Sequence, residues 1–152
     1  ACKLLAEAAQ AENGVCAYVE PTLVDAAALE AAVPANFNLI TYEGEQIGRQ
    51  SFYGQGAGQM PTAANVMQDC LSIQEGRLGF YAQQAVPTAL DGKAEAHPYY
   101  VRTSAPDAWL KEHTADTWDS GVVTGAVNTY EMLVWVRKQL TVDPACFIAG
   151  IR

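Results

Sequence analysis

The chain has 152 residues, a formal net charge of −8 and 50% hydrophobic residues, so it can bury a core beneath an acidic surface. Its nine Lys and Arg residues are scattered. Such a surface argues against nucleic acid and anionic membranes as partners, because both attract clustered positive charge. The sequence contains no run of about 18 apolar residues, so we expect no membrane-spanning helix.

The cysteines and histidines indicate neither a disulfide framework nor a metal site. The sequence predicts buried free thiols, and therefore a reducing, cytoplasmic location, for the four widely spaced cysteines: Cys2, Cys16, Cys70 and Cys146. His97 and His113 lie 16 positions apart without a companion cysteine, so we expect no zinc site.

The first third of the chain is expected to hold a helix, a strand and a short helix. Alanine-rich residues 3–11 predict a helix that ends at Asn13-Gly14. Residues 15–19 predict a strand ended by Glu20-Pro21, and Asp25 is expected to cap a helix over 26–32. Because the first residue is not Met and the start reads as the middle of a helix, we expect the chain to be cut from a longer one.

A hairpin and a helix are predicted next. Residues 37–42 and 47–53 flank a Gly-containing turn over 43–46, which is typical of a β-hairpin. A glycine-rich segment over 54–58 follows, and Pro61 favours the start of a helix. That helix is expected to carry one apolar face, formed by Ala63, Val66, Met67, Cys70 and Leu71.

The remainder predicts a linker and then a small α+β domain. Glycines and prolines break the pattern over 75–96, and we place a domain boundary near residue 92. We then expect a strand over 99–103, a helix over 106–113, a hairpin of 121–127 with 130–137, a connection over 138–143 and a strand over 146–151. This order predicts most of a ferredoxin-like βαββαβ unit with its second helix cut short.

The glycine-rich segment is the one candidate for binding chemistry. Glycines allow close backbone approach, and the start of the following helix favours an anion such as a nucleotide phosphate. A full dinucleotide-binding unit would add a βαβ crossover and an acidic residue about twenty positions on, so a plain tight turn remains the alternative. With two isolated histidines and no GxSxG, no catalytic triad can be assembled and no catalytic residue is nominated.

Several segments together resemble the homoserine dehydrogenase family over roughly residues 3–75. They are Lys3-Leu4-Leu5-Ala6, Val19-Glu20-Pro21-Thr22-Leu23-Val24, Phe37-Asn38, and the run from Phe52 through Ala63 with Val66 and Asp69. The resemblance implies an NAD(P)-dependent oxidoreductase that interconverts aspartate semialdehyde and homoserine, on the route to threonine and methionine. It also implies that a glycine loop helps close the cofactor pocket, and the matching residues are Gly54, Gly56, Ala57 and Gly58.

Departures from the family pattern shape the remaining expectations. The Rossmann fingerprint and the catalytic Asp and Lys are not found, so we expect all of them upstream of Ala1. The fingerprint would belong to a missing N-terminal nucleotide-binding domain, with the Asp and Lys on a later helix, and we expect no turnover and no bound cofactor for this chain alone. Residues 1–91 then represent the C-terminal portion of the catalytic region, an incomplete segment of helices with a β-hairpin sheet. Residues 92–152 resemble an ACT domain, a regulatory or assembly module.

The ACT-like half leaves the role of the chain open. The typical effector-holding turn contains a glycine, which is absent from residues 103–108. Packing or homodimerisation is therefore expected there at least as much as effector binding. The alternative function is an ACT-like amino-acid-binding or dimerisation module without enzymatic activity, and an inert scaffold is the third reading.

Overall fold

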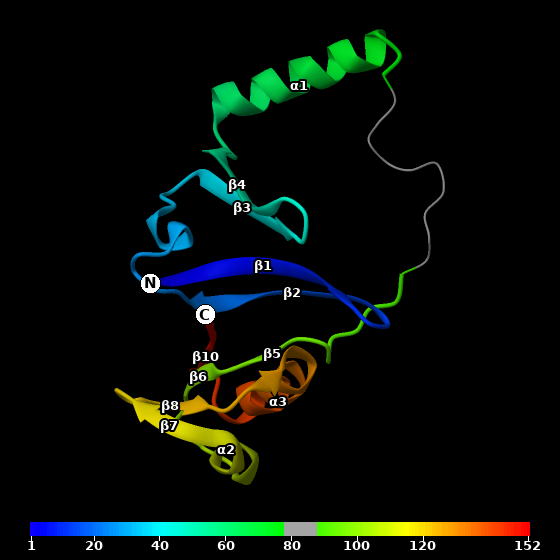
Figure 1. Ribbon diagram of the computed structural model, residues 1–152. Coiled ribbons are helices and arrows are strands. Elements are labelled where there is room, and N and C mark those ends of the chain that lie inside the picture. Colours follow the sequence, from blue (N-terminus) through cyan, green and yellow to red (C-terminus); the bar gives the residue numbers. More distant parts are fainter. Residues whose placement is uncertain (78–87) are drawn as a thin grey trace. The chain divides into compact units, whose positions relative to one another are not determined.

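The computed structural model describes residues 1–77 and 88–152, and it divides into two compact units (Figure 1). The first unit contains Ala1–Ala31 together with residues 88–152, and the second begins at Ala32. Part of the predicted linker over 75–96 lies outside the described residues. The two units do not follow the division at residues 91 and 92, which stays a prediction.

The N-terminus forms a long β-hairpin, so the prediction of a helix over 3–11 is wrong. Strand β1 (Cys2–Ala11) pairs antiparallel with β2 (Gly14–Leu23), and Glu12 and Asn13 form the turn. Side chains of β1 alternate between exposed and half-buried along its length. The helix propensity of alanine is a weak preference, and this paired, period-two arrangement overrides it. The strand predicted over 15–19 is present and continues past Pro21.

The C-terminal part of the first unit has the chain order and strand order of a ferredoxin-like fold. Its elements are β6 (Tyr99–Arg102), α2 (Ala108–His113), β7 (Thr114–Trp118), β8 (Gly121–Thr124), α3 (Thr129–Val142) and β10 (Phe147–Ile151), with short strands β5 (Ala96–His97) and β9 (Val127–Asn128) beside them. The sheet runs β10-β6-β8-β7 with antiparallel neighbours. The second helix is complete, so this unit is more regular than the sequence predicted.

The predicted hairpin of 121–127 with 130–137 is wrong, because the second of those segments lies in α3. Asn128 caps this helix: its Oδ1 accepts from the Glu131 N–H at 2.8 Å, and its Nδ2 donates to Glu131 Oε2 at 3.2 Å. An Asn followed three residues later by Glu is a helix-start pattern. Strand β8 pairs instead with β6 and with β7, and the sequence did not predict β7.

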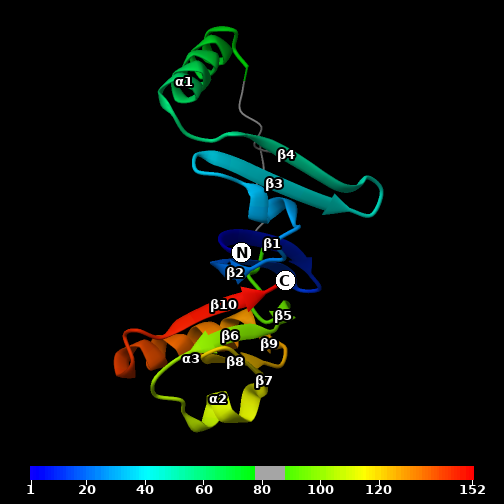
Figure 2. The same cartoon turned by 90° about the vertical axis from the view of Figure 1, so that its left-hand side faces the viewer.

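The core of the first unit lies between this sheet and its two helices (Figure 2). Helices α2 and α3 contribute Leu110, Met132 and Trp135, which are at most 5% exposed, and β6 contributes Tyr99 and Val101. The sheet also continues beyond β10, because β10 pairs in parallel with β2 at Thr22 and Leu23. The hairpin of β1 and β2 and the ferredoxin-like part therefore share one six-stranded sheet.

Residues 88–98, here called the strap, connect these elements and are bonded on two sides. The Val15 N–H donates to the Ala89 carbonyl at 2.9 Å, and the Asp91 N–H donates to the Val15 carbonyl at 2.9 Å. On the other side, the Thr129 hydroxyl at the start of α3 donates to the Gly92 carbonyl at 2.9 Å. This part of the predicted linker is therefore an ordered piece of the fold.

The second unit contains the predicted hairpin and helix with shifted ends. Strands β3 (Phe37–Gly44) and β4 (Gly48–Gln55) pair antiparallel, and α1 (Gln59–Gln74) begins two residues before Pro61. Between β2 and β3, the expected helix over 26–32 is reduced to a turn and a 3-10 helix, η1 (Leu29–Ala32). Asp25 Oδ1 still accepts from the Ala27 N–H at 2.7 Å, as a capping residue would.

Candidate functional site

The glycine-rich segment joins β4 to α1. Gly54 is the penultimate residue of β4. Gly56, Ala57 and Gly58 form the loop that leads into α1. The Gly56 N–H donates to the Asn36 carbonyl at 3.0 Å, so this amide is already engaged within the chain. Gly58 is the N-cap of α1 with φ of 132°, a conformation that residues with side chains rarely adopt. Three of the four predicted residues therefore lie in the β4–α1 loop and Gly54 lies at the end of β4, and the Gly56 amide is not available to a ligand.

Two asparagines hold this loop: Asn36, just before β3, and Asn38, the second residue of β3. The Asn36 Nδ2 donates to the Ala57 carbonyl at 2.8 Å. A Cβ built on Gly56 would lie 1.8 Å from Nδ2 and 2.3 Å from Cγ of Asn38, so the Asn38 carboxamide occupies that space. Neither asparagine was predicted as a site residue, although Asn38 belongs to the Phe37-Asn38 match.

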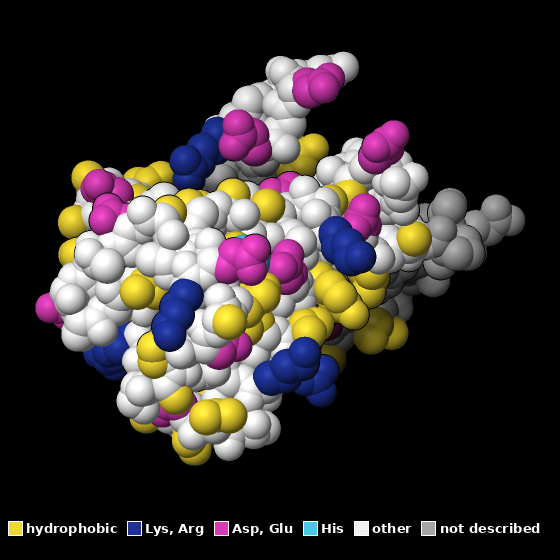
Figure 3. Space-filling model, turned by 90° about the horizontal axis from the view of Figure 1, so that it is seen from below, with side chains coloured by type: hydrophobic (Ala, Val, Ile, Leu, Met, Phe, Trp, Pro, Cys, Tyr) yellow, Lys and Arg dark blue, Asp and Glu magenta, His cyan; other side chains and the backbone are white. Residues whose placement is uncertain are grey.

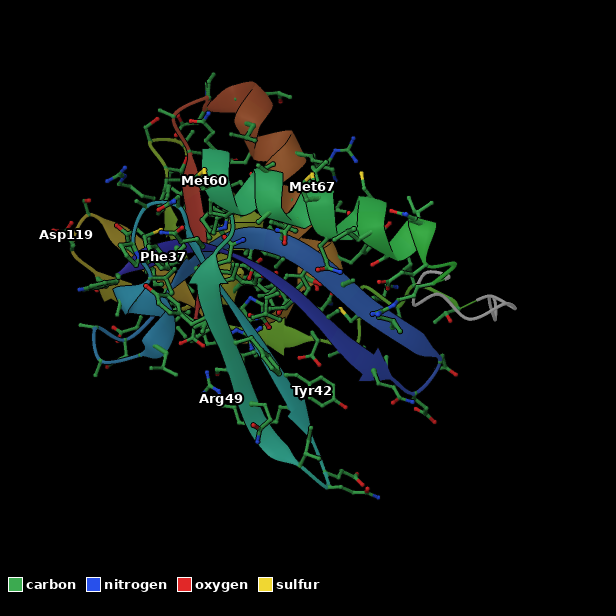
Figure 4. All side chains as sticks on the ribbon, turned by 90° about the horizontal axis from the view of Figure 1, so that it is seen from above. Phe37, Tyr42, Arg49, Met60, Met67 and Asp119 are labelled. Atoms are coloured by element: carbon green, nitrogen blue, oxygen red, sulfur yellow. The ribbon has the colours of Figure 1, made fainter. Side chains whose placement is uncertain are left out.

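The start of α1 has no side-chain cap within the described residues, since no side chain bonds to its first amides. The first N–H groups of a helix have no partner inside the helix and carry its positive end. An open apolar hollow of about 620 Å³ lies beside them, lined by Gly58, Gln59, Thr62, Ala63, Val66 and Met67. Met60 and Met67 project from the helix (Figure 4) and are 76% and 61% exposed. This arrangement suits a ligand with an anionic group and an adjoining apolar or ring surface.

A second polar cluster lies in the first unit, where β2 meets β5 and β6. Glu20 Oε1 is 2.6 Å from His97 Nε2, and the Tyr99 hydroxyl donates to Glu20 Oε2 at 3.1 Å. Burial, reinforced by the Glu20 charge, raises the pKa of Tyr99 above its usual range, so the phenol stays protonated as the donor. At the edge of this cluster, Arg152 bonds to both Glu7 and Tyr18. The cluster links the N-terminal hairpin to the ferredoxin-like sheet through side chains as well as backbone.

Other predicted features have mixed outcomes. All four cysteines are free, but Cys2 and Cys70 are exposed, so the prediction of burial is wrong for these two. Over residues 1–77 and 88–152, no three His, Cys, Asp or Glu side chains group as metal ligands would, and no helix is long and apolar enough to cross a bilayer. Figure 3 shows one face of the molecule, on which the Lys and Arg side chains lie apart from one another.

The fold resembles solved homoserine dehydrogenases. The structure from Thiobacillus denitrificans superposes with a TM-score of 0.71 over 99% of this chain and 42% of its own, at 22% identity. One from S. aureus gives a TM-score of 0.56 at 20% identity, over 99% of this chain and 41% of its own. Because both identities are below 25%, this likeness supports a shared fold and nothing further.

Sequence comparison identifies the family. Residues 1–71 match the homoserine dehydrogenase family. The homoserine dehydrogenase of Lactococcus lactis is 34% identical over 112 residues, which is 70% of this chain and 26% of that protein. That of Mycobacterium bovis is 39% identical over 101 residues, 61% of this chain and 22% of that protein. Through this segment the chain belongs to the homoserine dehydrogenase family, and it spans about a quarter of the length of these relatives.

Proposed function

We propose that this chain is the C-terminal part of an NAD(P)-dependent homoserine dehydrogenase, and that the loop over 54–58 with the start of α1 faces the cofactor. The observation that carries the proposal is the uncapped helix start, preceded by a glycine turn and flanked by an apolar hollow, at the position of the family's glycine motif. The cofactor supplies the hydride chemistry when it is bound. In this proposal the cofactor's main binding surface lies on a nucleotide-binding domain outside this chain, and the catalytic Asp and Lys also lie upstream of Ala1, so the chain alone is expected to show no turnover.

The role of this chain's own residues is orientation and exclusion of water. The amides at the start of α1 would offer donors to a phosphate or carboxamide oxygen, and their dipoles would favour negative charge there. Val66 and Met67 would cover an apolar or ring surface of the ligand beside them. The engaged Gly56 amide narrows the expected anion contacts to Ala57, Gly58 and the first residues of α1.

The test compares two glycines at opposite ends of α1 in the full-length enzyme. Gly58→Ala forces a side chain onto a residue with φ of 132° at the start of the helix, and Gly76→Ala does so at φ of 69° beyond its end. If the start of α1 faces the cofactor, Gly58→Ala raises the cofactor KM about tenfold, equivalent to roughly 1.4 kcal/mol, and Gly76→Ala leaves it unchanged. Equal effects of the two substitutions on the KM would overturn the proposal.

For residues 92–152 we propose an ACT-like assembly module that pairs two subunits, without an amino-acid effector. The support is the βαββαβ order together with the state of the turn after β6. There, Thr103 and Ser104 hydroxyls donate to Asp143 Oδ2 at 2.6 and 3.0 Å, and Gln139 Nε2 donates to the Ala105 carbonyl at 2.8 Å. The turn's polar groups are thus used internally. A thermal-shift panel of threonine, methionine and isoleucine is expected to give no rise in melting temperature, and a rise with any of them would restore the effector-binding alternative.

A further inference from the structure

We propose that Asn38 is a positioning residue for the glycine loop: its carboxamide sets the conformation at Gly56 and thereby the direction of the Ala57 and Gly58 amides. This inference rests on the proposed function, because it assigns Asn38 a role in presenting those amides to the cofactor. It also gives Gly56 a different purpose from the one that the sequence suggests. The sequence suggests that Gly56 lacks a side chain so that the cofactor can approach the backbone. In the structure, the carboxamide of Asn38 occupies that space instead.

The contact geometry supports this assignment. In the hairpin register Asn38 is the partner of Gly54, and Phe37 is the partner of Gln55, so Asn38 belongs to the ladder that ends where the loop begins. The three heavy atoms nearest to a Cβ at Gly56 all come from one side chain: it would meet Nδ2, Cγ and Oδ1 of Asn38 at 1.8, 2.3 and 2.8 Å. Real Cβ contacts are not that short, so any side chain at Gly56 must displace either Asn38 or the loop.

Neighbouring positions show that the contact is specific. A Cβ on Gly54, two residues earlier and the strand partner of Asn38, would meet nothing within 4 Å. On the other side, Asn36 engages the backbone at Gly56 and Ala57 and fixes the two ends of the same peptide segment. The loop is therefore held by the backbone carbonyl and the side-chain amide of Asn36 and is packed against the side chain of Asn38, and the helix start follows directly from it.

A double-mutant cycle in the full-length enzyme tests the inference, with cofactor KM, kcat and melting temperature measured for each variant. Gly56→Ala alone is expected to raise the cofactor KM about tenfold with little change in kcat, because the loop amides move out of place. Asn38→Ala alone is expected to raise it about threefold. In the double variant the clash is gone, so the KM should fall back to that of Asn38→Ala. Gly54→Ala, combined with Asn38→Ala in the same way, is the control and should show no coupling.

The outcomes separate this inference from the function on which it rests. Additive effects of Gly56→Ala and Asn38→Ala on the KM would overturn the positioning role and leave the cofactor-facing loop standing, because the cofactor itself would then require glycine. Coupling in melting temperature with an unchanged KM in every variant would overturn both. If Gly56→Ala does not fold, Asn38→Ala alone decides: a raised KM at unchanged kcat supports the role, and an unchanged KM refutes it.

Discussion

Replacing Tyr99 by phenylalanine removes one hydroxyl from the buried cluster around Glu20 without leaving a large cavity. Tyr99 is 0% exposed, and its hydroxyl donates to the Glu20 carboxylate at 3.1 Å. A hydrogen bond to a charged group contributes about 1.5–3 kcal/mol, and the Glu20 side chain is only 14% exposed, so water replaces the lost donor poorly. The expected result is a loss of about 1.5–3 kcal/mol in the free energy of unfolding of the first unit.

Urea unfolding followed by tryptophan fluorescence measures this loss, because all three tryptophans lie in the first unit. With a slope of about 1–3 kcal/mol per molar urea, the midpoint should fall by roughly 1 M. Tyr100→Phe is the matched control: Tyr100 is 7% exposed on the same strand, and its hydroxyl has no hydrogen bond within the described part of the chain. The reasoning is refuted if the two substitutions shift the midpoint equally.

Three further predictions concern the ferredoxin-like part. Hydrogen bonds from the Thr103 hydroxyl and the Ser104 N–H lower the pKa of Asp143. The contribution of Asp143 to stability is therefore full above about pH 4 and is lost as the pH falls through its folded-state pKa. Asp143→Asn should lower the urea midpoint at pH 7 and make the midpoint decline less in acid. Asn128→Ala removes the cap of α3 and should cost about 0.5–2 kcal/mol in thermal unfolding, whereas Asn128→Ser retains most of it. Thr129→Val removes the hydroxyl bond to the Gly92 carbonyl of the strap, which keeps its bond from the Tyr130 N–H, and should cost about 1 kcal/mol with faster amide exchange at Asp91. Unchanged exchange would show that the hydroxyl bond does not hold the strap.

The local patterns with a strong physical cause were predictable. The apolar period and Pro61 indicated α1, and the alternating segments around Gly44 indicated the β3–β4 hairpin. The N-terminal strand was missed because alanine-rich sequence favours helix locally, while the pairing with β2 that decides its structure depends on residues further along the chain. Helix α3 was missed although Asn128 and Glu131 form a readable capping pattern, because the β-branched and aromatic residues after them favoured a strand.

The candidate site was predicted in part. The glycine loop follows from the sequence, but Asn38 does not, because its place depends on the hairpin register. The expected four-residue turn pairs Tyr42 with Ile47, which sets Asn38 opposite Ser51. The structure pairs Gly44 with Gly48 and thereby moves Asn38 opposite Gly54. Because a change of register alters every cross-strand neighbour, an error in the predicted turn was enough to prevent the prediction of Asn38 as a positioning residue.

The order of strands in the six-stranded sheet has a consequence for how the protein is made. Strand β10 follows the other five strands of this sheet in the sequence, yet it lies between β2 and β6 and so occupies an inner position. During synthesis on the ribosome, the position between β2 and β6 stays empty until residues 147–151 have emerged. Until then β2 and β6 each present an open edge, which makes this stage of synthesis the one most exposed to chaperones and to aggregation.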